Sequence, residues 1–181
     1  MSYATVLHFD PATEDAVYAV WDALGGVVDR PMGDIGVRPH VTLADSDHVD
    51  LHALEAATAT FAASTLPFRL TLSSVGLFST AEGVLFFGVT VSRALLEMHA
   101  EYSRIFSYHA RQPNAYYRLG AWVPHVTLAM GLPEAQVSEA LAIVRRVPLP
   151  IHGSVPELSL VRVPDDGPVE TLGVFQLGRG G

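Results

Sequence analysis

The sequence PHVTLA at residues 39–44 occurs a second time at residues 124–129. The two copies lie 85 positions apart (125 minus 40) in a chain of 181 residues, so chance does not explain the repetition. Side chains alternate between the two faces of a β-strand. If each copy is a strand, it points one histidine and one threonine to the same face and its apolar residues to the other. Two such strands facing each other would bring two His-Thr pairs into one cleft.

The elements expected around the motif are repeated as well. Each motif strand is preceded by a strand and a helix and is followed by a helix and a further strand. The expected strands are 3–9, 37–44, 68–73, 84–91, 122–129, 157–163 and 169–177, and the expected helices start near residues 10, 51, 92 and 133. Asp10-Pro11, an acidic stretch ending at Asp50, and Ser92 are typical helix starts.

This order of elements predicts a duplicated α+β fold. We expect one bilobal domain over residues 1–181, with a first β-α-β-α-β-β repeat at about 3–80 and a second at about 82–178. Each lobe should be a mostly antiparallel sheet with its helices outside, and the two sheets should face a central cleft.

Residues near the motif extend the predicted site, and the two copies differ there. Arg38 should share a face with His40, Thr42 and Ala44, whereas the residue before the second motif at the same position is Val123. We therefore expect a cationic wall on one side of the cleft only, where Arg38 would hold a phosphate. As a simpler alternative, Arg38 is a solvated charge.

Two residues of the neighbouring strands should also face the cleft. His8 in strand 3–9 is expected there, and Phe86 occupies the matching place in strand 84–91, where its ring would stack on a base. The alternative for Phe86 is a core position. The aromatic stretch before the second motif, including Tyr117 and Trp122, is expected either to rim the cleft or only to pin a long loop.

The composition of the chain excludes several classes of ligand and partner. The formal net charge is −8, and all eleven basic residues are arginine, so a long nucleic-acid duplex is not an expected ligand. The absence of cysteine excludes disulfides, thiolate catalysis and cysteine-based zinc sites. The N-terminus lacks a basic signal-peptide region, and no apolar run is long enough to span a bilayer. We expect a cytoplasmic, monomeric protein with a small substrate and no membrane partner.

The chemistry of the two pairs favours phosphodiester cleavage. Histidine titrates near neutral pH, so one histidine can accept a proton from the attacking oxygen while the other protonates the leaving oxygen. Thr42 and Thr127 can donate hydrogen bonds to the phosphoryl oxygens. This scheme needs neither a metal nor a cofactor. A metal site is the competing chemistry, but neither motif histidine has a carboxylate on its expected face.

The paired His-x-Thr motifs, about eighty residues apart in a duplicated α+β chain, resemble the 2H phosphoesterase superfamily, and within it the 2′-5′ RNA ligases and RNA 2′,3′-cyclic phosphodiesterases. The resemblance covers nearly the whole chain. It implies metal-independent chemistry on 2′,3′-cyclic or 2′-5′ phosphodiesters of nucleotides or RNA ends, with His40, Thr42, His125 and Thr127 as catalytic residues. Which histidine acts as base stays open, and a nucleotide-binding module without turnover is the alternative function.

Overall fold

The computed structural model describes residues 1–29, 31–80 and 83–178. The four α-helices of these residues are α1 (Pro11–Leu24), α2 (Leu51–Ser64), α3 (Arg93–His109) and α4 (Glu134–Val144), and the two short 3-10 helices are η1 (Met32–Ile35) and η2 (Ala115–Tyr117). The strands are β1 (Ser2–His8), β2 (His40–Ser46), β3 (His48–Val49), β4 (Phe68–Phe78), β5 (Val84–Val89), β6 (Ala110–Arg111), β7 (His125–Ala129), β8 (Ile151–Val155), β9 (Glu157–Val163) and β10 (Glu170–Gln176).

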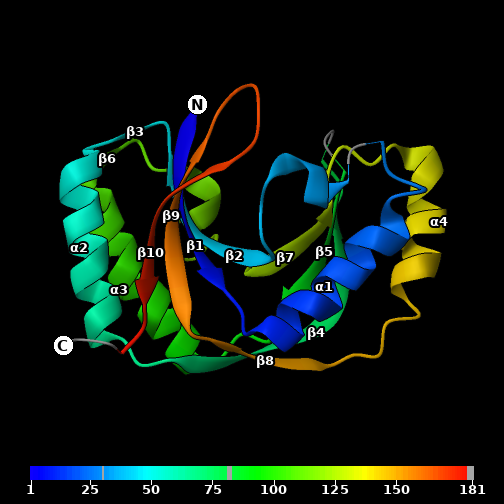
Figure 1. Ribbon diagram of the computed structural model, residues 1–181, viewed down its shortest axis with the longest axis horizontal. Helices are drawn as coiled ribbons and strands as arrows, with labels where there is room; N and C mark the ends of the chain where they lie inside the picture. Colours follow the sequence, from blue (N-terminus) through cyan, green and yellow to red (C-terminus); the bar gives the residue numbers. More distant parts are fainter. Residues whose placement is uncertain (30, 81–82, 179–181) are drawn as a thin grey trace.

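Eight of these strands form two four-stranded antiparallel sheets, and β3 pairs with β6 in a short two-stranded sheet. The mixture of helices and antiparallel sheets confirms the predicted fold class. The first sheet has the order β10-β9-β1-β2 and the second has the order β7-β5-β4-β8. Figure 1 shows the helices on the two outer flanks, with α2 and α3 beside the first sheet and α1 and α4 beside the second. The two motif strands, β2 and β7, are the edge strands that meet in the middle.

Each sheet contains strands from both predicted repeats. The first sheet takes β1 and β2 from the first repeat and β9 and β10 from the second, while β4 of the first repeat pairs with β5 in the second sheet. The helices cross over too, since α1 packs on β7 and β8 and α3 packs on β2. Each lobe of the structure is therefore built from elements of both predicted repeats. The repeat boundaries stay a prediction, and the expected junction at residues 81–82 lies outside the described residues.

Helix α1 is held to the second sheet by the residue that begins it. As predicted, Asp10 is the N-cap of α1: its Oδ1 accepts a hydrogen bond from the Thr13 amide at 3.1 Å. Its Oδ2 accepts bonds from the amide and the hydroxyl of Ser154, at 2.6 and 3.1 Å. Because Ser154 lies in β8, the cap of α1 also joins the end of β1 to the opposite sheet.

Several boundaries differ from those expected. The motif strands are shorter at their starts, at His40 and His125, because proline at the preceding position has no N–H for a ladder. β8 was not predicted, since its sequence IHGSV has a glycine in the centre and few apolar residues. Gly153 fits there because a Cβ at this position would lie 2.4 Å from the Thr13 hydroxyl oxygen.

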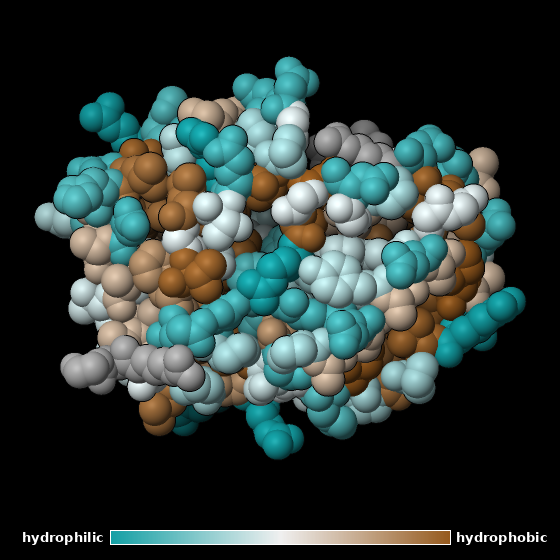
Figure 2. All heavy atoms as spheres, viewed as in Figure 1, coloured by the Kyte–Doolittle hydropathy of each residue, from teal (hydrophilic) through white to brown (hydrophobic). Residues whose placement is uncertain are grey.

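The exterior is mixed in character. Figure 2 shows hydrophilic residues across the middle of the viewed face, with brown hydrophobic atoms over both flanks. Within the residues that the structure describes, none of the helices has both the length and the apolar composition needed to cross a bilayer.

Candidate active site

The two motifs converge on one cavity of about 370 Å³ between the sheets. His40, Thr42, His125 and Thr127 all line it, as the sequence predicted for a shared cleft. The η1 segment and the β9–β10 hairpin contact each other along one side of the cavity. There the Val169 amide donates a hydrogen bond to the Ile35 carbonyl at 2.9 Å. Gly36 lets these segments approach, because its φ of 76° favours glycine and a Cβ there would lie 3.0 Å from Pro168.

Both motif histidines are held by the same local hydrogen bond. The Nδ1 atom of His40 lies 2.7 Å from the Arg38 carbonyl oxygen, and that of His125 lies 2.7 Å from the Val123 carbonyl oxygen. A carbonyl oxygen only accepts hydrogen bonds, so each Nδ1 carries the proton and donates it. The neutral form of each ring therefore has an unprotonated Nε2, which is the nitrogen left for a substrate.

Burial disfavours the charged form of both rings. It lowers the pKa of His40 and of His125 below the ordinary range, against the opposing effect of the carbonyl that each Nδ1–H contacts. A positive charge on His125 lowers the pKa of His40 further, which is the interaction expected of two rings sharing one cavity. The state in which only one of the two rings is positively charged is thus favoured over the state in which both are charged.

Different neighbours pack against the two rings. His8 is 4% exposed and lies edge-on to His40, with ring centroids 6.5 Å apart. Burial, followed by the nearby charge of Arg38, lowers the pKa of His8 to about 4, so His8 is neutral at pH 7. His125 instead meets Phe78 and Phe86, with centroids 5.0 and 5.2 Å away. The predicted cleft position of His8 agrees with its place in the cavity lining.

Phe86 has a different position from the one predicted. Its ring is 8% exposed and stacks on Phe78 at 4.3 Å, over Gly76, where a Cβ would lie 2.3 Å from it. Its faces are thus occupied by protein, and it supports His125 from the side rather than offering a surface to a base. The simpler alternative, a packed residue, describes Phe86 better.

Two tryptophans cap the inner edges of the motif strands. The Trp21 indole donates to the Thr127 carbonyl at 3.0 Å, and the Trp122 indole donates to the Thr42 carbonyl at 2.9 Å. Neither carbonyl has a strand partner on that side, since β2 and β7 end their sheets. These bonds satisfy carbonyl groups on the strand edges where the two sheets meet. The two His-Thr pairs are therefore held beside each other although the sheets are not continuous.

Arg38 lines the cavity, but carboxylates occupy much of its guanidinium group. Its Nε and Nη2 donate to Glu14 at 3.3 and 2.8 Å, and its Nη1 donates to Glu157 at 2.7 Å. One positive and two negative charges leave a net charge of −1 in this cluster when both carboxylates are ionised. The expected cationic wall is therefore absent from these described residues, and the phosphate contact of Arg38 stays a prediction that rests on its remaining N–H groups.

Each motif strand contains a β-bulge, which changes the residue that is next after the threonine to face the cavity. In β2, Val6 pairs with Thr42 and Thr5 pairs with Ala44, so Leu43 is the extra residue. The predicted face of Ala44 is therefore wrong: Ala44 is buried in the core, and Asp45 lines the cavity instead. The same register shift occurs in β7 opposite Leu85 and Phe86, and Met130 lines the cavity there.

Several residues at the site are not predictable from the sequence. Glu14, Glu157 and Asp45 carried no recognisable signal, because the first two are distant in sequence and the third depends on the bulge. Tyr117, expected only as a possible rim residue, lines the cavity. In the described ranges, no three His, Asp or Glu side chains are grouped so that they could hold a metal ion.

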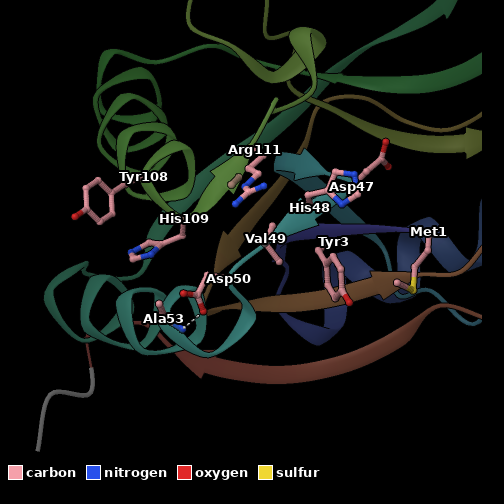
Figure 3. Close-up of a pocket in the computed structure, with 11 residues that line it drawn as sticks. Met1, Tyr3, Asp47, His48, Val49, Asp50, Ala53, Tyr108, His109 and Arg111 are labelled. Atoms are coloured by element: carbon pink, nitrogen blue, oxygen red, sulfur yellow. Dashed lines mark hydrogen bonds between the residues drawn. The ribbon is translucent and has the colours of Figure 1, made fainter.

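A larger cavity of about 890 Å³ lies on the helical side of the first sheet. Figure 3 shows Asp47 and His48 near β3, Arg111 from β6, and His109 at the end of α3. Its Asp50 carboxylate accepts from the Ala53 amide as the cap of α2. None of the predicted site residues lines this larger cavity.

The fold is that of a two-sheet protein in which the two His-Thr pairs line one cavity. Residues 12–167 match the model of the 2′-5′ RNA ligase superfamily. The chain belongs to this superfamily, and the resemblance to 2H phosphoesterases is confirmed. A Bacillus cereus (strain B4264) protein named as a candidate phosphoesterase is 28% identical over 148 residues, which is 80% of this chain and 81% of that one.

Solved structures share the fold. The protein TT0787 of Thermus thermophilus matches over 100% of both chains at 20% identity, with a TM-score of 0.68. Escherichia coli LigT in complex with 3′-AMP matches over 98% of both chains at 17% identity, with a TM-score of 0.61. Usb1 of Kluyveromyces marxianus matches over 94% of this chain and 97% of its own at 14% identity, with a TM-score of 0.53. At these identities the likeness shows a common fold.

Proposed function

We propose that the protein is a metal-independent phosphodiesterase that opens 2′,3′-cyclic or cleaves 2′-5′ phosphodiesters of nucleotides or RNA ends. The observation that carries the proposal is the pair of equivalent histidines, each with Nδ1–H bound to a backbone carbonyl at 2.7 Å, on one cavity. Crystal structures of LigT in complexes with 3′-AMP, ATP, NADP+ and phosphate support a small nucleotide as the substrate class.

The mechanism assigns one proton transfer to each histidine. For a 2′,3′-cyclic phosphate, a neutral histidine accepts a proton at Nε2 from water as the water oxygen bonds to phosphorus. The other histidine, protonated at Nε2, donates to the ribose oxygen as its bond to phosphorus breaks, and a nucleoside monophosphate results. Hydroxyl groups of Thr42 and Thr127 donate to the non-bridging oxygens, where negative charge develops. Ligation would be the reversal of the same cleavage.

A substrate panel tests the reaction class. We expect turnover of at least one 2′,3′-cyclic nucleotide or 2′-5′ dinucleotide, with the same rate in excess EDTA as without it, because both proton transfers and both phosphate contacts come from side chains. Chromatographic identification of the products would show which bond breaks. Activity abolished by EDTA and restored by a divalent metal would refute the metal-free scheme, and nucleotide binding without any turnover would favour the binding module.

The pH profile of kcat/KM is a second test. Acid-base catalysis by two histidines requires one proton shared between them, and this form is most populated midway between their two pKa values. Both pKa values are lowered by burial from about 6.5, so we expect the optimum of the free enzyme below pH 6.5. Activity should decline as the pH rises past the optimum, because the acid loses its proton.

Binding of the anionic diester favours protonated histidine, so the optimum of kcat should lie at a higher pH than that of kcat/KM. Steady-state kinetics from about pH 4 to about pH 9, with a stability check at each pH, would measure both profiles. A value of kcat/KM that keeps rising through about pH 8 would contradict the shared-proton scheme.

A further inference from the structure

The bulge at Leu43 gives the first lobe a carboxylate that has no counterpart in the second. Beyond a bulge the alternation of side chains is reversed, because two residues of one strand face one residue of its partner. Asp45 therefore pairs with Ala4 and shares the cavity lining with Ala4, Val6 and Thr42. At the equivalent place after the bulge of β7, the cavity is lined by Met130.

Asp45 is positioned by its neighbours but retains an unused acceptor. Its Oδ2 accepts a hydrogen bond from the Asn114 side-chain amide at 3.1 Å, and its backbone carbonyl accepts one from the Asn114 backbone amide at 2.8 Å. Its Oδ1 is buried and has no hydrogen-bond partner among the described residues. Asp45 also lines the cavity, where an N–H or O–H group of a bound molecule can donate a hydrogen bond to its carboxylate.

The surface between the catalytic pair and Asp45 is aliphatic. Ala4, Val6 and Val161 form a small cluster of their own on the cavity side of the first sheet, with Val163 and Val169 packed against it. Such a surface suits the face of a planar, uncharged group. A second phosphate is a poor match, because Asp45 would repel it and the arginine in the described cavity lining, Arg38, is paired with Glu14 and Glu157.

The spacing along β2 suits a single nucleotide. Asp45 lies three positions after Thr42, which corresponds to about 10 Å of strand, slightly less across a bulge. A phosphate at the His-Thr pairs would therefore place an attached base over the aliphatic surface, with its edge toward Asp45.

We propose that Asp45 is a specificity residue that accepts hydrogen bonds from the N–H edge of the base next to the scissile phosphate. This inference rests on the proposed function. Guanine presents two adjacent donors, N1–H and the 2-amino group, and suits a carboxylate best. Adenine and cytosine present one amino group, whereas the N3–H of uracil lies between two carbonyls that a carboxylate repels. The expected order of preference is guanine first and uracil last.

The test compares ratios rather than rates. We expect wild-type kcat/KM for guanosine 2′,3′-cyclic phosphate to exceed that for the uridine compound by about tenfold or more. In Asp45→Asn, the side-chain oxygen still accepts from Asn114, but the charge is lost and a donor replaces the free acceptor. The ratio should then fall to about one. Removal of a negative charge near a phosphate changes KM for both nucleotides together, so it cancels in the ratio.

Asp47→Asn is the matched control, because it removes the same charge two positions away from an exposed side chain on the other cavity (Figure 3). Its guanine-to-uracil ratio should equal that of the wild type. A ratio near one in the wild type, or a high ratio retained in Asp45→Asn, would overturn the proposal.

Binding measurements separate this inference from the proposed reaction. If no cyclic nucleotide is hydrolysed, titration calorimetry with guanosine and uridine 3′-monophosphates still compares the bases. Tighter binding of the guanosine compound by wild type, lost in Asp45→Asn, would support Asp45 as the base reader while the hydrolytic function fails. Equal affinities, or no binding of either nucleotide, would reject the role of Asp45.

Discussion

Replacing either motif histidine by alanine is expected to lower kcat by about 10²- to 10⁴-fold. His40→Ala removes one of the two groups that transfer protons, and His125→Ala removes the other. Both rings are only half-buried and make one side-chain hydrogen bond each, so the variants should remain folded. The rates would be measured with a hydrolysable 2′,3′-cyclic nucleotide, and folding would be checked by circular dichroism and thermal unfolding.

The double variant adds a sharper criterion. Residues that act as a unit have effects that are far from additive, so removal of both histidines should cost little more than removal of one. His48→Ala is the control, because His48 is exposed and lies on the larger cavity outside the site. Wild-type rates in either single variant would show that the catalytic residues are assigned wrongly.

Asp10→Ala is expected to have the largest effect on stability among single changes of partly exposed polar residues, lowering the free energy of unfolding by about 3 kcal/mol. About 1 kcal/mol comes from the lost helix cap, and about 2 kcal/mol comes from charged hydrogen bonds to the Ser154 amide and hydroxyl. For a chain of this size, the melting temperature should fall by roughly 6–12 °C. Urea unfolding at neutral pH would measure the change directly.

Asp50→Ala is the matched control for Asp10, since Asp50 caps α2 through the Ala53 amide. It should cost about 1 kcal/mol. Equal losses in the two variants would mean that the contact with β8 contributes nothing. The hydrogen bonds from Thr13 and Ser154 lower the pKa of Asp10 although burial opposes them. A depressed pKa stabilises the fold above the unfolded-state value of about 3.9, so the difference between wild type and Asp10→Ala should shrink as the pH falls through the folded-state pKa.

Local sequence determined which elements form. The caps Asp10, Asp50 and Ser92 each accept a hydrogen bond from an amide three residues ahead, as their positions predicted, because this contact lies within one helical turn. The alternation in the motif strands likewise indicated that His40 and Thr42 share a face, because two residues of a strand suffice to define it. The repeat then implied that the second pair would be equivalent.

The pairing of distant segments determined everything else about the cavity. The bulge that turns Asp45 into the cleft exists only in register with β1, and β2 by itself has no marker for it. Arg38 meets Glu14 and Glu157, which are 24 and 119 positions away, so its charge environment could not be inferred from its neighbours in sequence.

The sequence by itself thus determined the fold class and the two His-Thr pairs, because strand alternation and helix capping depend on residues a few positions apart. Only the tertiary structure decided that the repeats exchange strands, that Phe86 supports His125, and that Asp45 and Met130 take equivalent places in the cavity lining. Those outcomes depend on hydrogen-bond registers and side-chain packing between residues far apart in the chain, which form only when the two sheets assemble.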